Sequence, residues 1–376
     1  MKAWVLHGVN DFRMEEIEVP EVGSGEVLIE VKAAGICGSD IQRVYETGAH
    51  VHPIVIGHEF SGIVAGVGAA VDARWLGRRV GIYPLVPCGK CIPCRQRRYE
   101  MCRSYGYLGS RRNGGFAEYA AVPAGCLAEL PDGVSLEEAS MLEPMAVAVH
   151  AMRRIMPKEP ETVVICGLGT IGLMILMFLR EAGIRKILAI GNKDFQRRTA
   201  LKIGLEEECF FDTRSGNVAQ WIAEKTAGMG ADVFFECVGR NETIARAVDN
   251  TVPGGRICLV GNPYSDITLK KSVYWKILRN QLTITGTWNS CYADALSGRA
   301  YSEHEEFSAE RLPKQTLDGL GDDWQYVLER LSQDKVRPTD LISHRFLLEE
   351  LEQGFHIMRG KKEEYGKVMC ITSRVK

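Results

Sequence analysis

The sequence predicts an α/β protein that joins a β-rich part to a doubly wound domain with a parallel sheet. Two patterns indicate this class. Up to about residue 149 the chain consists of short β-type segments separated by glycines, and from Pro160 apolar strands alternate with amphipathic helices. At about 150 residues per domain, 376 residues are enough for two or three folded units.

Each expected strand of the β-rich part is a short apolar or β-branched run between turn residues. We expect these strands at residues 2–6, 26–33, 62–67, 79–83 and 116–122. In the following part each strand is apolar throughout and each helix has one apolar face, which is typical of a parallel sheet covered on both sides. Its expected strands are 162–166, 186–190, 232–236 and 256–260, and its helices are 171–181, 194–203, 218–225 and 243–250.

The alternation of strand and helix ends beyond about Gly286. A helix at 324–331 and a short strand at 368–371 are expected near the end of the chain. Residues 293–322 are polar and show no clean period, which predicts a long loop.

Charge and composition describe an ordinary globular chain. There are 46 basic and 48 acidic side chains, so there is no electrostatic footprint for nucleic acid or for an anionic membrane. Residues 1–11 lack the apolar stretch of a signal peptide, and the run 171–179 is shorter than the roughly 20 residues of a membrane-spanning helix. We therefore expect a cytoplasmic protein with reduced cysteines and small-molecule ligands, and neither nucleic acid nor a membrane as partner.

Four of the twelve cysteines stand close together in the sequence. Cys88, Cys91, Cys94 and Cys102 have the spacing C-x2-C-x2-C-x7-C. Four thiolates at this spacing can surround one tetrahedral ion and leave no position for substrate, which predicts a structural zinc. An iron–sulfur cluster is the alternative interpretation, but there the fourth cysteine follows after three residues and precedes proline, whereas Cys102 follows after seven.

Three further residues, Cys37, His58 and Glu143, carry side chains that bind metals. Singly, each has a structural interpretation as a buried thiol, a core histidine or a helix-terminal glutamate. Together they supply one thiolate, one imidazole and one carboxylate, which is a zinc shell with an open position for an alcohol oxygen. The sequence thus predicts a second, catalytic zinc.

A glycine fingerprint for a dinucleotide follows the expected strand 162–166. Gly167, Gly169 and Gly172 form G-x-G-x-x-G, with Thr170 and Ile171 between them at the start of a helix. Between a buried strand and a helix, this motif indicates a Rossmann domain. The glycines allow the tight turn, the approach of the pyrophosphate and close helix packing.

The position that selects between NAD and NADP departs from the NAD pattern. NAD-binding domains place a carboxylate on the ribose about 20 residues beyond the fingerprint. Here the second strand is followed by Gly191, Asn192 and Lys193, so nothing repels a 2′-phosphate and the last two can bind it. We favour NADP(H) over NAD(H). The alternative is that Lys193 and the nearby Arg197 and Arg198 simply lie in solvent.

These motifs, in this order, resemble the zinc-dependent medium-chain dehydrogenases over essentially the whole chain. Segments 48–50, 57–62, 109–112, 114–119 and 276–279 are most similar to the polyol-phosphate subgroup. The resemblance implies a GroES-like catalytic domain formed by residues 1–149 and 291–376, and a Rossmann domain at 150–290. It also implies a homodimer or homotetramer.

The resemblance also assigns roles to individual residues. It implies that Cys37, His58 and Glu143 bind the catalytic zinc and that Glu59 can replace a water or Glu143. Asp40 would orient His58, and Ser39 would pass the proton outward. By the same resemblance, the nucleotide-lining residues are Cys237, Val260 and Gly261, with Lys367 on the pyrophosphate.

The implied reaction is hydride transfer between a secondary alcohol of a polyol or sugar and NAD(P). Open-site zinc lowers the pKa of bound water from about 15.7 to about 7, and a similar effect on an alcohol is worth of order 12 kcal/mol. Arg111 and Arg112 could clamp a substrate phosphate, or could be exposed residues of a hairpin. An unphosphorylated diol, sugar or alcohol, as in sorbitol, butanediol or threonine dehydrogenases, is the alternative substrate, and a non-enzymatic relative is a further alternative.

Overall fold

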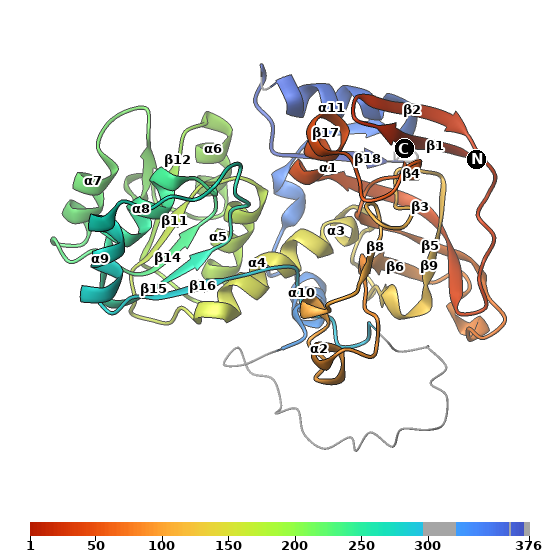
Figure 1. Cartoon of the computed structure of the whole chain (residues 1–376), viewed down its shortest axis with the longest axis horizontal. Coiled ribbons are helices and arrows are strands. Elements are labelled where there is room, and N and C mark those ends of the chain that lie inside the picture. The colour runs from red at the N-terminus through yellow and green to blue at the C-terminus, as the bar shows by residue number, and fades with distance from the viewer. Residues whose placement is uncertain (296–320, 361, 372–376) are drawn as a thin grey trace. The chain divides into compact units, whose positions relative to one another are not determined.

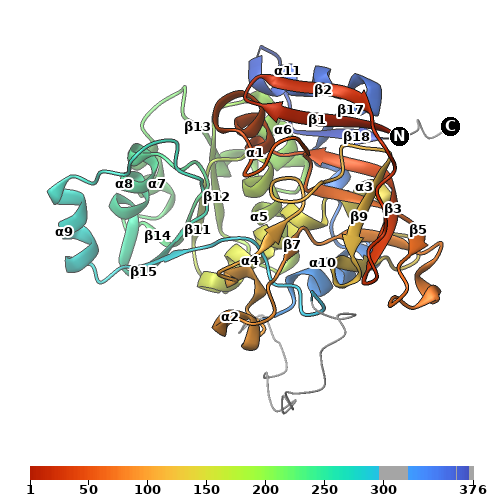
Figure 2. The ribbon, with the colours of Figure 1, turned by 45° about the vertical axis from the view of Figure 1, so that its right-hand side comes forward.

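The computed structural model describes residues 1–295, 321–360 and 362–371 (Figures 1 and 2). The loop predicted at 293–322 therefore lies almost entirely outside the described residues. The described chain forms two compact units, of which the first contains Met1–Glu143 and the residues from Ser290 onward, and the second contains Pro144–Asn289. Within the described residues, no helix is both long enough and apolar enough to cross a membrane.

The second unit is built on a parallel sheet. Its described residues form six strands in the order β13-β12-β11-β14-β15-β16. The chain order reverses beside β11, and a sheet of this kind binds ligands beyond the carboxyl ends of its strands at that point. Its elements are α4 (Leu142–Ile155), which begins in the first unit, β11 (Val163–Cys166), α5 (Thr170–Glu181), β12 (Ile187–Gly191), α6 (Asp194–Lys202), β13 (Phe210–Asp212), α7 (Val218–Lys225), β14 (Ala231–Glu236), α8 (Asn241–Asp249), β15 (Thr251–Leu259), α9 (Lys271–Arg279) and β16 (Thr283–Gly286).

Both faces of this sheet are covered, which explains why its strands are apolar throughout. One face packs against α7, α8 and α9 through a cluster that includes Val164, Leu188, Phe234, Ile222 and Val248. The intervening strand residues, such as Val163, Ile165 and Phe235, are also fully buried, and α5 and α6 lie on that side of the sheet (Figures 1 and 2). The predicted α/β class with a doubly wound parallel sheet is confirmed. The two edge strands were not predicted, because β13 has three residues and β16 is partly exposed and rich in threonine.

The first unit is rich in β-strands. Its larger sheet has the described order β10-β6-β5-β3-β18-β17, with β9 also paired to β3, and a smaller sheet has the order β2-β1-β4. Its strands are β1 (Lys2–Gly8), β2 (Asp11–Glu16), β3 (Glu26–Ile36), β4 (Ile54–Val55), β5 (Glu59–Val67), β6 (Arg79–Ile82), β7 (Leu85–Val86), β8 (Gly106–Tyr107), β9 (Tyr119–Pro123), β10 (Leu127–Glu129), β17 (Ile342–Leu347) and β18 (Lys367–Ile371). Its helices are α1 (Gly38–Gln42), α2 (Ile92–Arg95), α3 (Leu136–Ser140), α10 (Asp323–Ser332) and α11 (Leu351–Gly360).

The two ends of the chain build one core in this unit. The Nε1 of Trp4 donates to the backbone oxygen of Leu348 at 2.6 Å, and the ring of Phe12 packs on that of Phe355 in α11 with centroids 4.9 Å apart. The last strand, β18, pairs with β3, so that Val368 lies opposite Ile36. Residues near both ends of the sequence thus meet where β3 ends, which is where Cys37 follows.

Candidate metal centres and cofactor site

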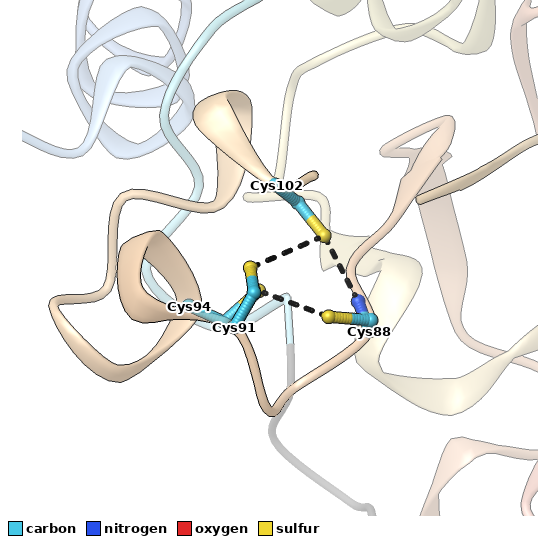
Figure 3. Close-up of side chains that lie close together, drawn as sticks. All are labelled: Cys88, Cys91, Cys94 and Cys102. Carbon is cyan, nitrogen blue, oxygen red and sulfur yellow. Dashed lines mark hydrogen bonds between the residues drawn. The ribbon is translucent and has the colours of Figure 1, made fainter. Parts of the chain in front are cut away.

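The four clustered cysteines point toward one another (Figure 3). The Sγ of Cys91 lies 3.5 Å from that of Cys94 and 3.9 Å from that of Cys102, and the sulfurs of Cys88 and Cys94 are 3.9 Å apart. Four sulfurs at about 2.3 Å from one zinc ion lie about 3.8 Å from each other. The arrangement therefore fits a single tetrahedral ion, and it leaves no room for several irons between the sulfurs.

Backbone N–H groups hold the pKa of two of the four cysteines, Cys88 and Cys91, below the usual value, whereas burial raises the pKa of Cys94 and Cys102. Backbone N–H groups of Arg103 and Cys94 lower the pKa of Cys91 to about 6, and the N–H of Cys88 donates to the Sγ of Cys102 at 3.2 Å. Cys91 caps α2 and Cys94 lies within it, so one short helix holds two of the four ligands. All twelve cysteines are free thiols.

The second group of candidate ligands lies where three neighbouring strands end or begin. Cys37 follows β3, His58 and Glu59 stand at the start of β5, and Lys367 opens β18. Because β5, β3 and β18 are adjacent in the sheet, these residues lie together. Ligand atoms of Cys37, His58 and Glu59 are all within 4.8 Å of one another.

Glu59 has a buried cationic partner in Lys367. The Nζ of Lys367 donates to Oε2 of Glu59 and, at 3.1 Å, to the backbone oxygen of Ile36. Both charged side chains are only 2% exposed. Lys367, which the resemblance places on the pyrophosphate, is thus ion-paired with a candidate zinc ligand in the first unit.

Glu143 lies in the first turn of α4, a helix that was not predicted. Its Oε1 accepts a hydrogen bond of 3.3 Å from the hydroxyl of Tyr107, whose ring lies 5.7 Å from that of His58. Burial raises the pKa of Glu143 to about 7 and keeps Tyr107 protonated by raising its pKa as well. Glu143 is therefore near His58 but is not among the three residues whose ligand atoms lie within 4.8 Å.

Asp40 holds the histidine and the start of α1. Its Oδ1 lies 3.3 Å from Nδ1 of His58, an ion-pair contact without good hydrogen-bond geometry, and its Oδ2 accepts from the backbone N–H of Cys37 at 3.0 Å. Burial alone would raise the pKa of Asp40, but the charges of His58 and Arg43 outweigh it and hold that pKa below its usual value. Because Nδ1 faces Asp40, Nε2 of His58 is the nitrogen left for a metal.

Both groups of residues fit zinc. The four cysteines form a closed sulfur shell, whereas Cys37, His58 and a carboxylate form a mixed shell of three ligands, as in catalytic sites. In the described residues these are the two groups of at least three possible ligands with atoms this close.

The glycine fingerprint lies between β11 and α5. Gly167 has φ +98°, in the region that favours glycine, and a Cβ there would lie 2.6 Å from Cγ2 of Val238. A Cβ on Gly172 would lie 2.0 Å from the backbone oxygen of Gly167, so α5 could not pack this closely on the turn. Gly169 is the N-cap of α5, and Thr170 and Ile171 form its first turn, where N–H groups are available to a phosphate.

Apart from Lys367, the other expected nucleotide residues also lie at carboxyl ends of strands in the second unit. Cys237 directly follows β14, and Val260 and Gly261 follow β15. The backbone N–H groups of Val260 and Gly261 donate to the backbone oxygen of Glu236. The carboxylate of Glu236 accepts from the N–H groups of Val238 and Gly239. This buried glutamate fixes the turn that follows β14.

The end of β12 lies near a basic residue, Arg214, that the sequence alone did not indicate. Gly191 ends β12, and its backbone oxygen accepts a hydrogen bond of 2.9 Å from the N–H of Thr213. Arg214, which follows Thr213 in the chain, forms ion pairs with Asp194 and Asp212. Asn192 donates its N–H to the side chain of Gln196, and Lys193 caps α6. Arg197 is paired with Glu207. Residues 191 and 214 are far apart in the sequence, so only the fold shows that they are neighbours.

The two candidate substrate arginines contact different partners. The guanidinium of Arg111 lies over the ring of Tyr105 at 4.9 Å, whereas Arg112 forms an ion pair with Glu26 at the start of β3. Burial lowers the pKa of His50, and the positive charges of Arg111 and Arg43 lower it further. Arg111 and Arg43 therefore both lie near His50, while the charge of Arg112 is already balanced by Glu26.

Comparison with known proteins matches both units to described families. The alcohol dehydrogenase GroES-like domain matches residues 23–132, and the zinc-binding dehydrogenase family matches residues 170–298. Galactitol 1-phosphate 5-dehydrogenase of Escherichia coli K12 is 30% identical over 360 residues, which is 96% of each chain. L-idonate 5-dehydrogenase of Vitis vinifera is 35% identical over 277 residues, which is 72% of this chain and 75% of the relative.

Solved structures show the same similarity. Galactitol-1-phosphate dehydrogenase from Escherichia coli has a TM-score of 0.85 at 30% identity, covering 99% of this chain and 100% of that one. A zinc-binding dehydrogenase from Sinorhizobium meliloti 1021 bound to NADP has a TM-score of 0.83 at 26% identity over 98% of both chains. An alcohol dehydrogenase from Escherichia coli CFT073 complexed with NADH has a TM-score of 0.84 at 26% identity over 99% of both.

Proposed function

Because this chain belongs to the zinc-dependent medium-chain dehydrogenases, a family of alcohol and polyol oxidoreductases, we propose that it oxidises a secondary alcohol of a phosphorylated polyol or sugar with NADP. The proposal includes a catalytic domain at 1–149 and 291–376, a Rossmann domain at 150–290, two zinc ions per chain and a cytoplasmic location, where thiolate ligands stay reduced.

One observation carries the proposal. A thiolate, an imidazole and a carboxylate converge within 4.8 Å at Cys37, His58 and Glu59, and Ser39 stands two residues from the first of them. A non-enzymatic relative has no use for an incomplete metal shell beside a hydroxyl. When bound, zinc polarises the substrate hydroxyl and the dinucleotide accepts the hydride.

The side chains of the protein transfer the proton and position the candidate metal ligands. The Oγ of Ser39 takes the proton of the substrate hydroxyl and releases its own to solvent, and the carbon that loses the hydride becomes a ketone. The carboxylate of Asp40 faces Nδ1 of His58 at 3.3 Å, and this charge contact orients the imidazole. The ion pair of Lys367 and Glu59 determines whether that carboxylate is free to act as a ligand.

The decisive experiment is an oxidation assay of the purified protein with a panel of polyols, sugars and their phosphates, each with NAD and with NADP. We expect the highest kcat/KM for a phosphorylated polyol or sugar. A preference for an unphosphorylated diol, sugar or threonine would replace the substrate part of the proposal. No turnover with any alcohol, in protein that contains two zinc ions, would favour a non-enzymatic role.

Gly191→Asp is expected to shift cofactor preference toward NAD by at least about tenfold in kcat/KM, which is about 1.4 kcal/mol, because the new carboxylate repels a 2′-phosphate and accepts from the ribose hydroxyls. A Cβ at this position would lie 2.8 Å from Oε1 of Gln196, the end of a flexible side chain that can move. Gly191→Asn is the matched control, since it has the same shape without the charge. A wild-type enzyme that already prefers NAD would contradict the NADP assignment.

Arg111→Ala is expected to raise KM for a phosphorylated substrate at least about tenfold while KM for the unphosphorylated analogue changes little, because a charge-assisted contact to phosphate is lost. Arg112→Ala is the matched control, because its guanidinium is already paired with Glu26. Initial rates with both substrates measure the difference. If both variants leave KM for the phosphorylated substrate unchanged, neither arginine binds the phosphate. If only Arg112→Ala raises this KM, Arg112 and not Arg111 binds it.

The second unit supports a homo-oligomer. Tyr274, Trp275 and Leu278 on α9 and Trp288 after β16 are each about half exposed, and β16 is an edge strand among the described strands. Large exposed apolar side chains beside an open strand edge mark a contact surface. Sedimentation velocity would measure the dimer or tetramer, and a monomer at micromolar concentration would contradict this part of the proposal.

A further inference from the structure

Arg43 contacts two residues of the proposed site with one nitrogen. It follows α1 directly, and its Nη1 donates to the Oγ of Ser39 at 2.9 Å and to the Oδ1 of Asp40 at 2.8 Å. The side chain of Arg43 is 17% exposed and Asp40 is fully buried. No motif in the sequence pointed to this arginine.

The chemistry of these contacts is directional. A guanidinium has donors and no acceptor, so Ser39 accepts from Arg43 and must turn its own hydrogen elsewhere. The proton that Ser39 handles therefore cannot leave through Arg43. A fixed positive charge beside the Oγ also favours the negative charge that develops there when the serine gives up its proton.

The same nitrogen completes the surroundings of Asp40. The Oδ1 of Asp40 lies between Arg43 and Nδ1 of His58, and its Oδ2 accepts from the N–H of Cys37. A fully buried carboxylate needs such partners to remain charged. Arg43 thus contacts both the residue that orients the imidazole and the residue that transfers the proton.

We propose that Arg43 is a positioning residue that acts through Ser39 on proton transfer and through Asp40 on the metal affinity of the three-ligand site. The part that involves Ser39 rests on the proposed dehydrogenase function, whereas the part that involves Asp40 does not. The competing explanation is a local helix contact. Pairs at i,i+3 and i,i+4 stabilise a helix only slightly, and a role of this kind would leave metal affinity unchanged.

The test compares Arg43→Gln and Arg43→Lys with wild type by two independent measurements. The first is a Co²⁺ titration of the full chain after a chelator has removed the ion from the three-ligand site, with one zinc per chain remaining. The second is kcat and KM for the best substrate of the panel. Arg78→Gln is the matched control, because Arg78 lies in the same unit and pairs with Glu129 at 3.4 Å in an exposed position.

We expect Arg43→Gln to weaken Co²⁺ binding about tenfold and to lower kcat about 10- to 100-fold, as outer contacts of metal ligands do, with KM changed less than about threefold. Arg43→Lys should recover part of both losses, since it keeps the charge beside Asp40. In the Ser39→Ala background, Arg43→Gln should reduce kcat by a much smaller factor, because the route through the serine is already lost. The control should match wild type.

Unchanged Co²⁺ affinity together with unchanged kcat in Arg43→Gln would overturn the proposal, and so would an effect on KM alone, which would indicate a substrate contact. If the glutamine variant does not fold, as judged by circular dichroism, the lysine variant and the Ser39→Ala pair carry the same comparison. If wild type oxidises no alcohol, the proposed function fails, while the Co²⁺ titration still decides whether Arg43 supports the metal site through Asp40.

Discussion

Cys37→Ser is expected to lower kcat by about 10³-fold or more and to reduce the zinc content from two ions to one per chain. The thiolate is the strongest donor of the three-ligand site, and without bound zinc nothing lowers the pKa of the substrate hydroxyl. Elemental analysis of the purified protein and initial rates measure the two effects. Cys209→Ser is the matched control, because Cys209 is a half-buried thiol outside both clusters. Full activity in Cys37→Ser would show that the catalytic site lies elsewhere.

Zinc analysis of variants can also identify which carboxylate binds the metal at this site. Glu59 lies within 4.8 Å of the other ligands but is paired with Lys367, whereas Glu143 is hydrogen-bonded to Tyr107. If Glu59 is the resident ligand, Glu59→Gln lowers the zinc content and Glu143→Gln does not; the reverse result assigns the metal to Glu143. Loss of zinc in both variants would indicate that the two carboxylates alternate.

Cys94→Ser is expected to destabilise the protein by at least about 4 kcal/mol and to remove the other zinc. Cys94 is only 4% exposed and its sulfur lies within 3.9 Å of the sulfurs of Cys88 and Cys91, so its loss opens a closed shell and leaves three thiolates to repel one another. We expect a lower melting temperature by circular dichroism and one zinc per chain by elemental analysis.

The cause of this loss can be separated from the loss of a buried thiol. Cys126→Ser removes a fully buried sulfur from the core of the same unit without touching the cluster, so it should lower stability and keep both zinc ions. Wild-type protein treated with a strong chelator should approach the melting temperature of Cys94→Ser. A cluster variant that keeps two zinc ions and its melting temperature would contradict a structural metal.

A site could be predicted from the sequence where all of its residues lie within one short segment. Four cysteines within fifteen positions, and three glycines within six, carry their geometry in their spacing, because local turns alone bring them together. The parallel sheet was also predictable, since strands buried on both faces are apolar throughout. Edge strands such as β16 carry no such signal, because one side of each is left to solvent.

The sequence was insufficient where a role depends on a distant partner. The sequence groups Arg112 with Arg111 as candidate phosphate ligands, and only the fold shows that Arg112 is paired with Glu26, 86 residues away. The resemblance suggests Lys367 as a pyrophosphate contact, and only the pairing of β18 with β3 shows that it also forms an ion pair with Glu59. Tyr107 and Arg43 are ordinary residues in ordinary segments, and only tertiary packing places them against Glu143 and Asp40.

Because Lys367 lies on β18, the buried partner of Glu59 is added late in synthesis. Cys37, His58 and Glu59 leave the ribosome more than 300 residues before Lys367, the buried counter-charge of Glu59. Until Lys367 has emerged, the nascent protein holds an acidic side chain without its cation at the candidate metal site. A nonsense mutation or a proteolytic cut just before Lys367 would therefore leave Glu59 without this partner, although every candidate metal ligand is still present.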